Sequence, residues 1–391
     1  MREDDAAAAL ERIHRENPFP AICGRICPAP CEPACIFHED GAPIAIRSLE
    51  RYAADFGRAK PRKDRPVPAD KGKKIAVIGA GPSGMSAAYF LARGGYGVTM
   101  FEAMGEPGGL LRYGVPEFRL PQKVLDEQMA QLALMGVKVV ANVLVGGTLS
   151  VRETFAQGHD ALLLTVGAGL PDFADIPGHQ WGGVYYAEEF LMRAQSAGKE
   201  QAFDACGRLL HGLQTAVVGG GPSALDAARL AVRCGRQVHL IFGGMEEEMG
   251  VGADDLAAAL EEGVHVHAPV EPLAIEAGPD GFASGVQCRR LEVIERERKL
   301  VLEPMADGQM MIEAQTVILS HGRRPNPFLR QHLPQLKWNV NGTLWMDERT
   351  GLTSVAKIFA AGNVATGAGP VVDAIASGKQ AAKQMMEFLS R

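Results

Sequence analysis

Short apolar runs alternate with longer amphipathic stretches along most of the chain. The runs predict buried strands at 75–78, 98–101, 137–140, 161–166, 238–242 and 358–360. The stretches, with apolar residues every three or four positions, predict helices at 1–16, 42–57, 121–135, 254–263 and from Pro370 onward. Between 264 and 311 the pattern predicts several short strands. This alternation of strands and helices is typical of an α/β fold.

The range Lys74–Glu102 carries a complete dinucleotide-binding fingerprint. An apolar strand leads into a GxGxxG turn at Gly79, Gly81 and Gly84, and a helical run and a second strand ending at Glu102 follow. The helix N-terminus would hold a pyrophosphate, with Pro82 and Ser83 completing the turn. Glu102 can accept hydrogen bonds from both ribose hydroxyls, which favours FAD or NAD over a 2′-phosphorylated nucleotide. The alternative is a glycine-rich turn in another kind of α/β protein.

A second fingerprint follows near position 219. Gly219, Gly221 and Ala224 form GxGxxA between a strand and a helix, and Pro222 and Ser223 lie inside this turn. Two such units imply two dinucleotides, unless the second unit keeps the fold without a ligand. Gly243 and Gly244 follow its second strand, where an acid selects NAD and an arginine selects NADP. With no guanidinium to meet a 2′-phosphate, the sequence favours NAD(H).

Four other segments complete the expected flavin site. The stretch 106–121 is rich in glycine and proline and predicts an ordered loop on a ligand, with contacts from Gly109, Leu110 and Arg112. The strand ending near Thr165 and Gly167 brings backbone close to a flavin. Gly362 and Asn363 form another glycine turn, and the helix beginning at Pro370 and Val371 points at it. That helix N-terminus would stabilise negative charge on a reduced flavin by about 0.3 to 2 kcal/mol.

Four cysteines recur at every fourth position near the N-terminus: Cys23, Cys27, Cys31 and Cys35. On one helix they would spread over about 18 Å, and the intervening prolines disfavour such a helix. We therefore expect the segment to wrap so that its thiolates converge on an iron–sulfur cluster. Zinc and reduced structural thiols are the alternatives, and the spacing matches neither zinc ribbons nor bacterial ferredoxins. Cys206, Cys234 and Cys288 are scattered singly.

Composition narrows the class of protein further. Of 391 residues, 47% are hydrophobic and 22% charged, with a formal net charge of −6, which gives no footprint for nucleic acid binding. No apolar run is long enough to span a membrane, and the charged N-terminus does not resemble a signal peptide. A cytoplasmic location is expected, where clustered cysteines favour metal over disulfides. His265, His267 and His321 are interpreted as ordinary polar residues.

The sequence resembles the small subunit of bacterial glutamate synthase and its relatives, which include the flavin-bearing part of dihydropyrimidine dehydrogenase and the large subunit of NADH-dependent ferredoxin:NADP oxidoreductase. The resemblance rests on NPFPAICGRICPAPCEPAC, IAVIGAGPSG, FEAMGEPGGLLRYGVPEFRLP, TVGAGLP, VVGGGPSALDAAR and AAGNVATGAGPVVDAI. It implies an N-terminal iron–sulfur segment and linker (1–70), a discontinuous FAD domain (71–170 and 315–391) and an inserted NAD(P) domain (171–314).

The function implied is that of an NAD(P)H-dependent flavoprotein oxidoreductase. Electrons would pass from reduced nicotinamide through FAD and one [4Fe–4S] cluster to a partner redox subunit or carrier protein, within a hetero-oligomeric complex. Hydride transfer needs alignment of nicotinamide with flavin, so no catalytic acid or base is expected. The second unit has no CxxC pair, which argues against dithiol exchange.

The chain departs from the family pattern at several positions. Relatives usually have a further cysteine-rich stretch upstream, so we expect a single cluster here, with Cys23 or an outside group as its fourth ligand. They commonly have arginines at Gly243 and Gly244, aspartate at Asn363 and asparagine at Pro222. The changes at Gly243, Gly244 and Pro222 motivate an alternative function: an FAD and iron–sulfur relay or structural subunit whose nicotinamide site is silent.

Overall fold

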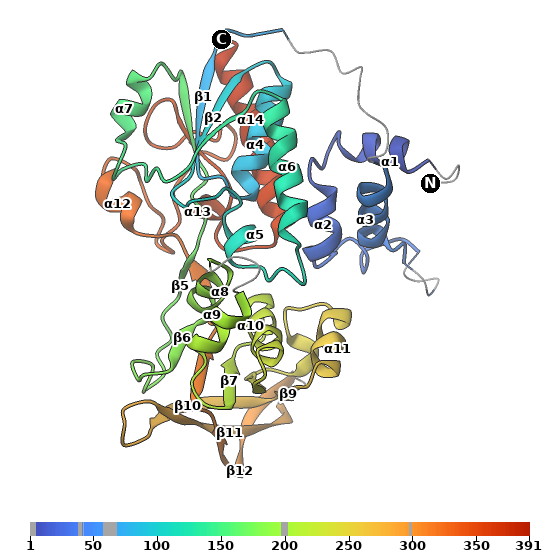
Figure 1. The fold of residues 1–391 in the computed structure, drawn as a ribbon, viewed down its shortest axis with the longest axis vertical. Coiled ribbons are helices and arrows are strands. Elements are labelled where there is room, and N and C mark those ends of the chain that lie inside the picture. The colour runs from blue at the N-terminus through green and yellow to red at the C-terminus, as the bar shows by residue number, and fades with distance from the viewer. Residues whose placement is uncertain (1–4, 38–40, 42, 58–68, 197–201, 297–298) are drawn as a thin grey trace. The chain divides into compact units, whose positions relative to one another are not determined.

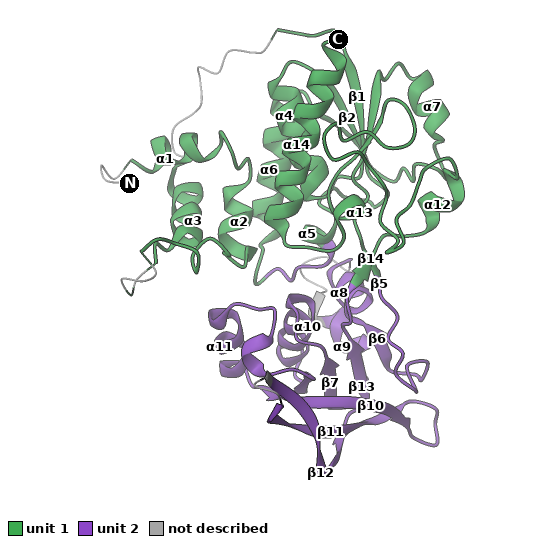
Figure 2. Ribbon diagram, turned by 180° about the vertical axis from the view of Figure 1, so that it is seen from behind, with its two compact units in different colours: residues 1–112, 118–170, 323–391 green, residues 113–117, 171–322 purple. Residues whose placement is uncertain are grey.

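The chain forms two compact units. The computed structural model describes residues 5–37, 41, 43–57, 69–196, 202–296 and 299–391. The first unit comprises Met1–Arg112, Phe118–Leu170 and Arg323–Arg391, and the second comprises Tyr113–Glu117 and Pro171–Gly322 (Figure 2). The second unit is therefore inserted in sequence within the first.

A five-stranded parallel sheet forms the centre of the first unit. Its order is β15 (Ile358–Ala360), β4 (Ala161–Leu164), β1 (Lys74–Ile78), β2 (Gly97–Phe101) and β3 (Lys138–Val140). One face carries α4 (Pro82–Arg93), α6 (Gln122–Leu134) and α14 (Val371–Leu389), and the other carries α7 (Val151–Ala156) and α12 (Phe328–His332) (Figure 1). The apolar runs of β1 and β4 are buried as predicted, whereas all three residues of β3 are exposed at the sheet edge.

Close packing of α14 on α4 depends on a glycine. A Cβ on Gly378 would lie 2.1 Å from the carbonyl oxygen of Ser83, so any larger residue would force the two helices apart. The Ser86 hydroxyl also donates a hydrogen bond to the Ile375 carbonyl at 2.7 Å. The C-terminal helix is thereby fixed against the helix that follows the first glycine turn.

The second unit has a parallel sheet with a second sheet packed on it. The parallel order is β6 (Val184–Tyr186), β13 (Thr316–Leu319), β7 (Gln214–Val218), β8 (Gln237–Ile241) and β9 (Val264–His267). Its helices are α8 (Ala187–Ser196), α9 (Ala202–Leu209), α10 (Pro222–Arg233) and α11 (Ala253–Glu261). The antiparallel sheet contains β10 (Val270–Ala277), β11 (Ala283–Arg296) and β12 (Lys299–Glu313). Val218 and Leu319 share one buried core with Val286 and Ile312.

Two features of this unit differ from expectation. The region 264–311 forms long strands rather than several short ones, because β11 and β12 pair along nearly their whole length across one register shift. The return to the first unit was expected at 315, yet β13 pairs with β6 and β7 and so belongs to the second unit. The chain returns only after Gly322, where β14 (Arg323–Arg324) pairs with β5 (Leu170–Pro171).

Three helices precede the first sheet: α1 (Ala6–Ile13), α2 (Pro20–Ile26) and α3 (Ile46–Phe56). The Asp5 side chain caps α1 by accepting hydrogen bonds from two backbone N–H groups. Pro20 occupies the first turn of α2, where its missing N–H has no intrahelical acceptor, so this proline begins a helix. Most of the predicted linker, 58–68, lies outside the described residues.

Three short helical elements occur within loops: α5 (Leu110–Tyr113), α13 (Asn363–Thr366) and the 3₁₀ turn η2 (Glu246–Glu248). The stretch 106–121 was expected to lack regular structure, but α5 forms inside it, between Gly109 and Gly114. No helix in the described part of the chain is both long and apolar enough to cross a membrane.

Candidate cofactor sites

The first glycine turn connects β1 to α4. Gly79 has φ 103°, and a Cβ there would lie 2.6 Å from the Thr165 carbonyl oxygen. A Cβ on Gly84 would lie 2.0 Å from the Gly79 carbonyl oxygen, so both positions need glycine to bring helix and strands together. Gly81 caps α4, and a Cβ there would meet nothing within 4 Å. The space beside Gly81 is open at the helix N-terminus, where a pyrophosphate binds in this motif.

Glu102 lies at the end of β2, and only 6% of its surface is exposed. Its Oε2 atom accepts a hydrogen bond from the Ala80 N–H at 2.9 Å, and its Oε1 atom accepts one from the Met104 N–H at 2.9 Å. An ionised carboxylate accepts about four hydrogen bonds, so it keeps capacity for two ribose hydroxyls. The backbone of the glycine turn therefore fixes the orientation of this carboxylate.

Two buried polar atoms near the turn have no partner within the described part of the chain. Ser83 Oγ and Asn363 Oδ1 form no hydrogen bond there, although neither is accessible. The two segments are adjacent, since a Cβ on Gly362 would lie 2.7 Å from the Ser83 Cβ atom. Buried polar atoms are normally hydrogen-bonded, so these two atoms fit a missing ligand with polar groups. FAD has such groups in its pyrophosphate and ribityl chain, and the residues present fit it.

The loop that contains α5 lies against the same turn. A Cβ on Gly109 would lie 3.0 Å from the Gly81 Cα atom, and the Gly108 N–H donates to the Ala80 carbonyl at 2.9 Å. Gly109 and Leu110 are thus close to the open space beside Gly81.

Arg112 contacts its own loop and α6. Its guanidinium donates to the Pro107 carbonyl at 2.7 Å and the Gln122 side chain at 2.9 Å, and it pairs with Asp126 at 2.6 Å and Glu106 at 2.8 Å. Most of its donors already have protein partners. The structure therefore gives Arg112 a role in holding the loop in place.

The other expected flavin contacts lie at strand ends. Gly167 has φ 72°, and a Cβ there would meet no atom within 4 Å. The Gly362 N–H donates to Ser377 Oγ at 2.8 Å, which ties the last glycine turn to α14. Pro370 caps α14 immediately before Val371, as the sequence predicts. Ser377 was not among the predicted residues, because nothing in its local sequence distinguishes it from other helical serines.

The second glycine turn repeats the backbone of the first. Gly219 has φ 138°, and a Cβ there would lie 2.4 Å from the Ser320 carbonyl oxygen. Gly221 caps α10 and is open, with no atom within 4 Å of a Cβ. Pro222 and Ser223 form the first helical turn behind it. The residues at this turn fit a second pyrophosphate.

The strand end beside this turn carries no positive side chain of its own. A Cβ on Gly243 would find its nearest neighbour, the Val270 carbonyl oxygen, at 3.9 Å, so this position has room. Gly244 is crowded by the Phe242 ring and by Glu248 Oε2, which accepts a hydrogen bond from the Met245 N–H at 2.9 Å. Three acids, 246–248, follow in η2. They disfavour the doubly charged 2′-phosphate of NADPH.

The four N-terminal cysteines do not converge in this structure. Cys23 lies inside α2, Cys27 ends that helix, and both are buried, whereas Cys31 is exposed and Cys35 is partly buried. Burial raises the pKa of the Cys23 thiol to about 12, and the charge of nearby Glu50 acts in the same direction. Among the described residues, no group of three or more thiol, imidazole or carboxylate side chains could hold a metal ion. The donor chemistry suits an iron–sulfur cluster, but this arrangement does not fit one.

Two sets of residues outside the predicted sites are separated in sequence but lie close together in the structure. Cys206 and Cys234, expected to be isolated thiols, form a disulfide with a Cα–Cα separation of 6.5 Å. It joins α9 to the C-terminal end of α10, about 18 Å of helix away from Gly221. His239, His265 and His267 cluster on β8 and β9, with His239 Nδ1 2.9 Å from His267 Nε2. The register of β8 and β9 was needed to find the histidine cluster, and the packing of α9 against the end of α10 to find the disulfide.

Family models and solved structures show the class of protein to which the chain belongs. Residues 73–381 match the family model described as pyridine nucleotide-disulphide oxidoreductase, and residues 1–62 match dihydropyrimidine dehydrogenase domain II, 4Fe-4S cluster. FprA from Mycobacterium tuberculosis has the same fold, with a TM-score of 0.66 and 19% identity over 81% of this chain and 85% of that one. The predicted fold class is thereby confirmed.

The sequence relatives narrow this class. The chain is 32% identical to the glutamate synthase [NADPH] small chain of Escherichia coli, over 97% of this chain and 83% of that protein. It is 33% identical to the NADP(+)-dependent formate dehydrogenase subunit beta of Moorella thermoacetica, over 97% of this chain but only 56% of that protein. The chain belongs to the pyridine nucleotide-disulphide oxidoreductase family, in the group of the glutamate synthase small chain. The expected cofactor set of FAD, nicotinamide nucleotide and [4Fe–4S] cluster is that of this group.

Proposed function

We propose that this chain is an NAD(P)H-dependent oxidoreductase subunit that delivers electrons to a partner redox subunit or carrier protein. The observation that carries the proposal is the pair of open glycine turns at Gly81 and Gly221, each at the N-terminus of a helix. When bound, the nicotinamide nucleotide and FAD would supply the redox chemistry, namely hydride transfer between their rings and release of single electrons to the partner.

The chain's own residues bind and orient these groups. Gly81, Ser83 and the α4 N-terminus would hold the FAD pyrophosphate, Glu102 the adenosine ribose, and Asn363 the ribityl chain. The α14 N-terminus favours negative charge at the flavin by about 0.3 to 2 kcal/mol. Gly221 and Ser223 would hold the nicotinamide nucleotide. Correct alignment of the two rings accounts for the rate, and no protein acid or base is required.

For the nucleotide, we propose NADH. The relatives named above carry NADPH or NADP(+) in their names, which favours the phosphorylated nucleotide. In this chain, Gly243 and Gly244 offer no cation, and the acids at 246–248 repel a 2′-phosphate. Local chemistry therefore favours the unphosphorylated nucleotide.

An anaerobic titration of the purified protein tests these proposals. We expect NADH to bleach the flavin absorbance at a lower concentration than NADPH does, and a broad iron–sulfur absorbance to decline after it. Bleaching by NADPH first would reject the NADH preference. A protein that carries FAD but is bleached by neither nucleotide would support the relay alternative, in which only a partner reduces the flavin.

A further inference from the structure

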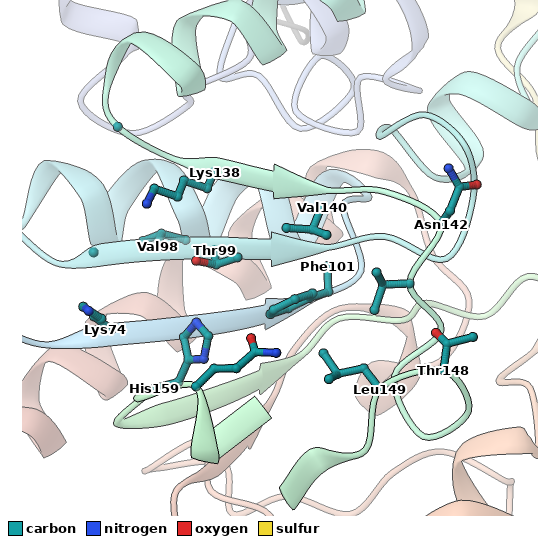
Figure 3. Close-up of a pocket in the computed structure, with 14 residues that line it drawn as sticks. Lys74, Val98, Thr99, Phe101, Lys138, Val140, Asn142, Thr148, Leu149 and His159 are labelled. Carbon is teal, nitrogen blue, oxygen red and sulfur yellow. The ribbon is translucent and has the colours of Figure 1, made fainter. Parts of the chain in front are cut away.

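We propose that a hollow beside the β3 edge of the first sheet binds a small carboxylate with an apolar body. The hollow has a volume of about 580 Å³ and lies over β1, β2 and β3 (Figure 3). Small-molecule sites typically measure about 300 to 1,000 Å³. It opens on the face of the sheet opposite α4 and α6, and no site described above includes it.

The strand register places its lining residues on one face. Lys74 pairs with Gly97 on β2, and Thr99 and Phe101 pair with Lys138 and Val140 on β3. Paired residues in neighbouring strands project to the same side of a sheet. Gly97 contributes no side chain, and this leaves space beside Lys74 at the cationic end of the floor.

One end of the hollow is cationic. Lys74 and Lys138 are exposed, and neither forms an ion pair with any residue that the structure describes. Neighbouring Lys73, by contrast, is paired with Asp160 at 3.0 Å. The Thr99 hydroxyl lies between the two free lysines (Figure 3). Two ammonium groups and a hydroxyl suit an anionic head group, because charged partners make the stronger hydrogen bonds.

The other end is mostly apolar. Phe101 forms the middle of the floor, and Val140 and Leu149 extend it away from the lysines (Figure 3). His159 meets the Phe101 ring edge to face at 5.9 Å, and its Nδ1 lies 2.8 Å from the Thr154 carbonyl oxygen. Because a carbonyl only accepts, Nδ1 carries the proton and Nε2 remains for a ligand. An anionic head on an apolar body matches this arrangement better than a free phosphate does.

The wall of the hollow is bonded to the flavin site. The Glu102 N–H donates to the Val140 carbonyl at 2.9 Å, and the Val143 N–H donates to the Glu102 carbonyl at 2.8 Å. Phe101 precedes Glu102 directly. A ligand that orders 140–143 would therefore also order the carboxylate that we propose holds the FAD ribose. By linkage, FAD and the carboxylate should strengthen each other's binding.

Calorimetric titration of the FAD-loaded full chain with phenylacetate and with octanoate tests the site. We expect saturable binding, weakened about 100-fold in the Lys74→Met/Lys138→Met double variant because each lost charged contact accounts for about tenfold. Gly97→Leu should abolish binding by filling the hollow. Gly97 has no positive φ, and its nearest non-neighbouring atom is 3.5 Å from a Cβ, so the fold should tolerate this change.

Controls separate the parts of the proposal. Lys123→Met removes an exposed lysine on α6 outside the hollow and should leave binding unchanged. 2-Phenylethanol, which lacks the charge, should bind more weakly than phenylacetate. Absence of saturable binding, or binding unaffected by both hollow variants, would overturn the site, and equal affinity for inorganic phosphate would overturn the carboxylate assignment. An unchanged rate of FAD release with phenylacetate bound would reject the link to Glu102, which rests on the proposed function.

Discussion

The two glycine turns have the same backbone conformation but differ in the residues that surround them. Both begin with a glycine of positive φ, both leave the second glycine open, and both lead into a twelve-residue helix with proline in its first turn. At the end of the following strand the first unit has buried Glu102, clamped by two backbone N–H groups. The second has Gly243 and Gly244 before a run of acids. We therefore propose that the turn binds a pyrophosphate in both units, whereas the strand end determines which nucleotide is bound.

The two turns also differ in how they are enclosed. A distant segment closes the first turn: Gly362 and α14 come from the last 30 residues and leave Ser83 Oγ and Asn363 Oδ1 buried without partners. The second turn is contacted by Ser320 and by Gly250, whose N–H donates to the Gly220 carbonyl at 2.9 Å. Its Gly221 side is open, as is the Gly81 side of the first turn, but among its described residues no buried polar side-chain atom lacks a hydrogen-bond partner. Buried polar atoms without partners suit a resident cofactor, which we propose for the first turn.

Alanine variants at the two open glycines should have the largest effects, and each variant should impair the binding of a different cofactor. Both glycines have ordinary backbone angles and no protein atom within 4 Å of a Cβ, so neither change strains the fold. Gly81→Ala should leave the purified protein with at most about a tenth of its FAD, because the methyl group obstructs the pyrophosphate. Gly221→Ala should keep its FAD but need about ten times more nucleotide for flavin reduction.

Flavin content by absorbance and anaerobic reduction by NADH measure these outcomes. Gly207→Ala, on α9, is the control, since its Cβ also meets nothing within 4 Å and it lies in neither turn. Loss of FAD from the Gly221 variant, with the Gly81 variant unaffected, would reverse the assignment of the two sites.

An arginine introduced at Gly243 should test whether this strand end determines the preference for NADH or NADPH. Gly243→Arg has room for its side chain and supplies a guanidinium where the second unit has none. We expect the ratio of NADPH to NADH affinity to rise about 10- to 100-fold, the value of a charge-assisted hydrogen bond of about 1.5 to 3 kcal/mol. Gly243→Gln adds similar length without charge and should not change the ratio. An unchanged ratio in the arginine variant would mean that the adenosine ribose lies elsewhere.

The sequence was most informative where chemistry depends on neighbours along the chain. Strand, turn and helix of both fingerprints lie within 30 residues, so β1, α4, β7 and α10 could be predicted closely. The partners of Gly362 could not, since Ser83 is almost 280 positions away and only helix packing joins them. Likewise, the Cys206–Cys234 disulfide depends on how α9 meets the end of α10. Local patterns predict a turn, but long-range packing decides what closes it.

The cysteine segment shows the limit of spacing arguments. Its later prolines were expected to prevent one helix through all four cysteines, and α2 does end at Ile26; the short helix that includes Cys23 and begins at Pro20 was not expected. The thiols of Cys23 and Cys27 are consequently buried in or beside a helix. The sequence predicts thiolate ligands, and this stays a prediction, while the backbone path around them depends on helix capping.

The smallest expected effect concerns the histidine cluster, which exists only in the second unit. Burial lowers the pKa of His239 and His267, and the charges of their neighbours His265 and Arg290 add to this. A histidine whose pKa is lower when folded binds protons more readily when unfolded. The unit should therefore be fully stable above the unfolded value of about 6.5 and lose stability as the pH falls from there toward the lowered folded values.

Thermal unfolding of the full chain between pH 8 and 5.5 measures this loss. In a domain of this size, each kcal/mol moves the Tm by about 2 to 4 °C. His239→Gln removes one imidazole but can still pair with His267 and Gln214, which His239 contacts at 2.9 and 3.3 Å. It should flatten the pH dependence of the second unit's transition and leave that of the FAD-bearing unit unchanged. Equal flattening in both transitions would assign the pH dependence to carboxylates elsewhere and remove this last difference between the units.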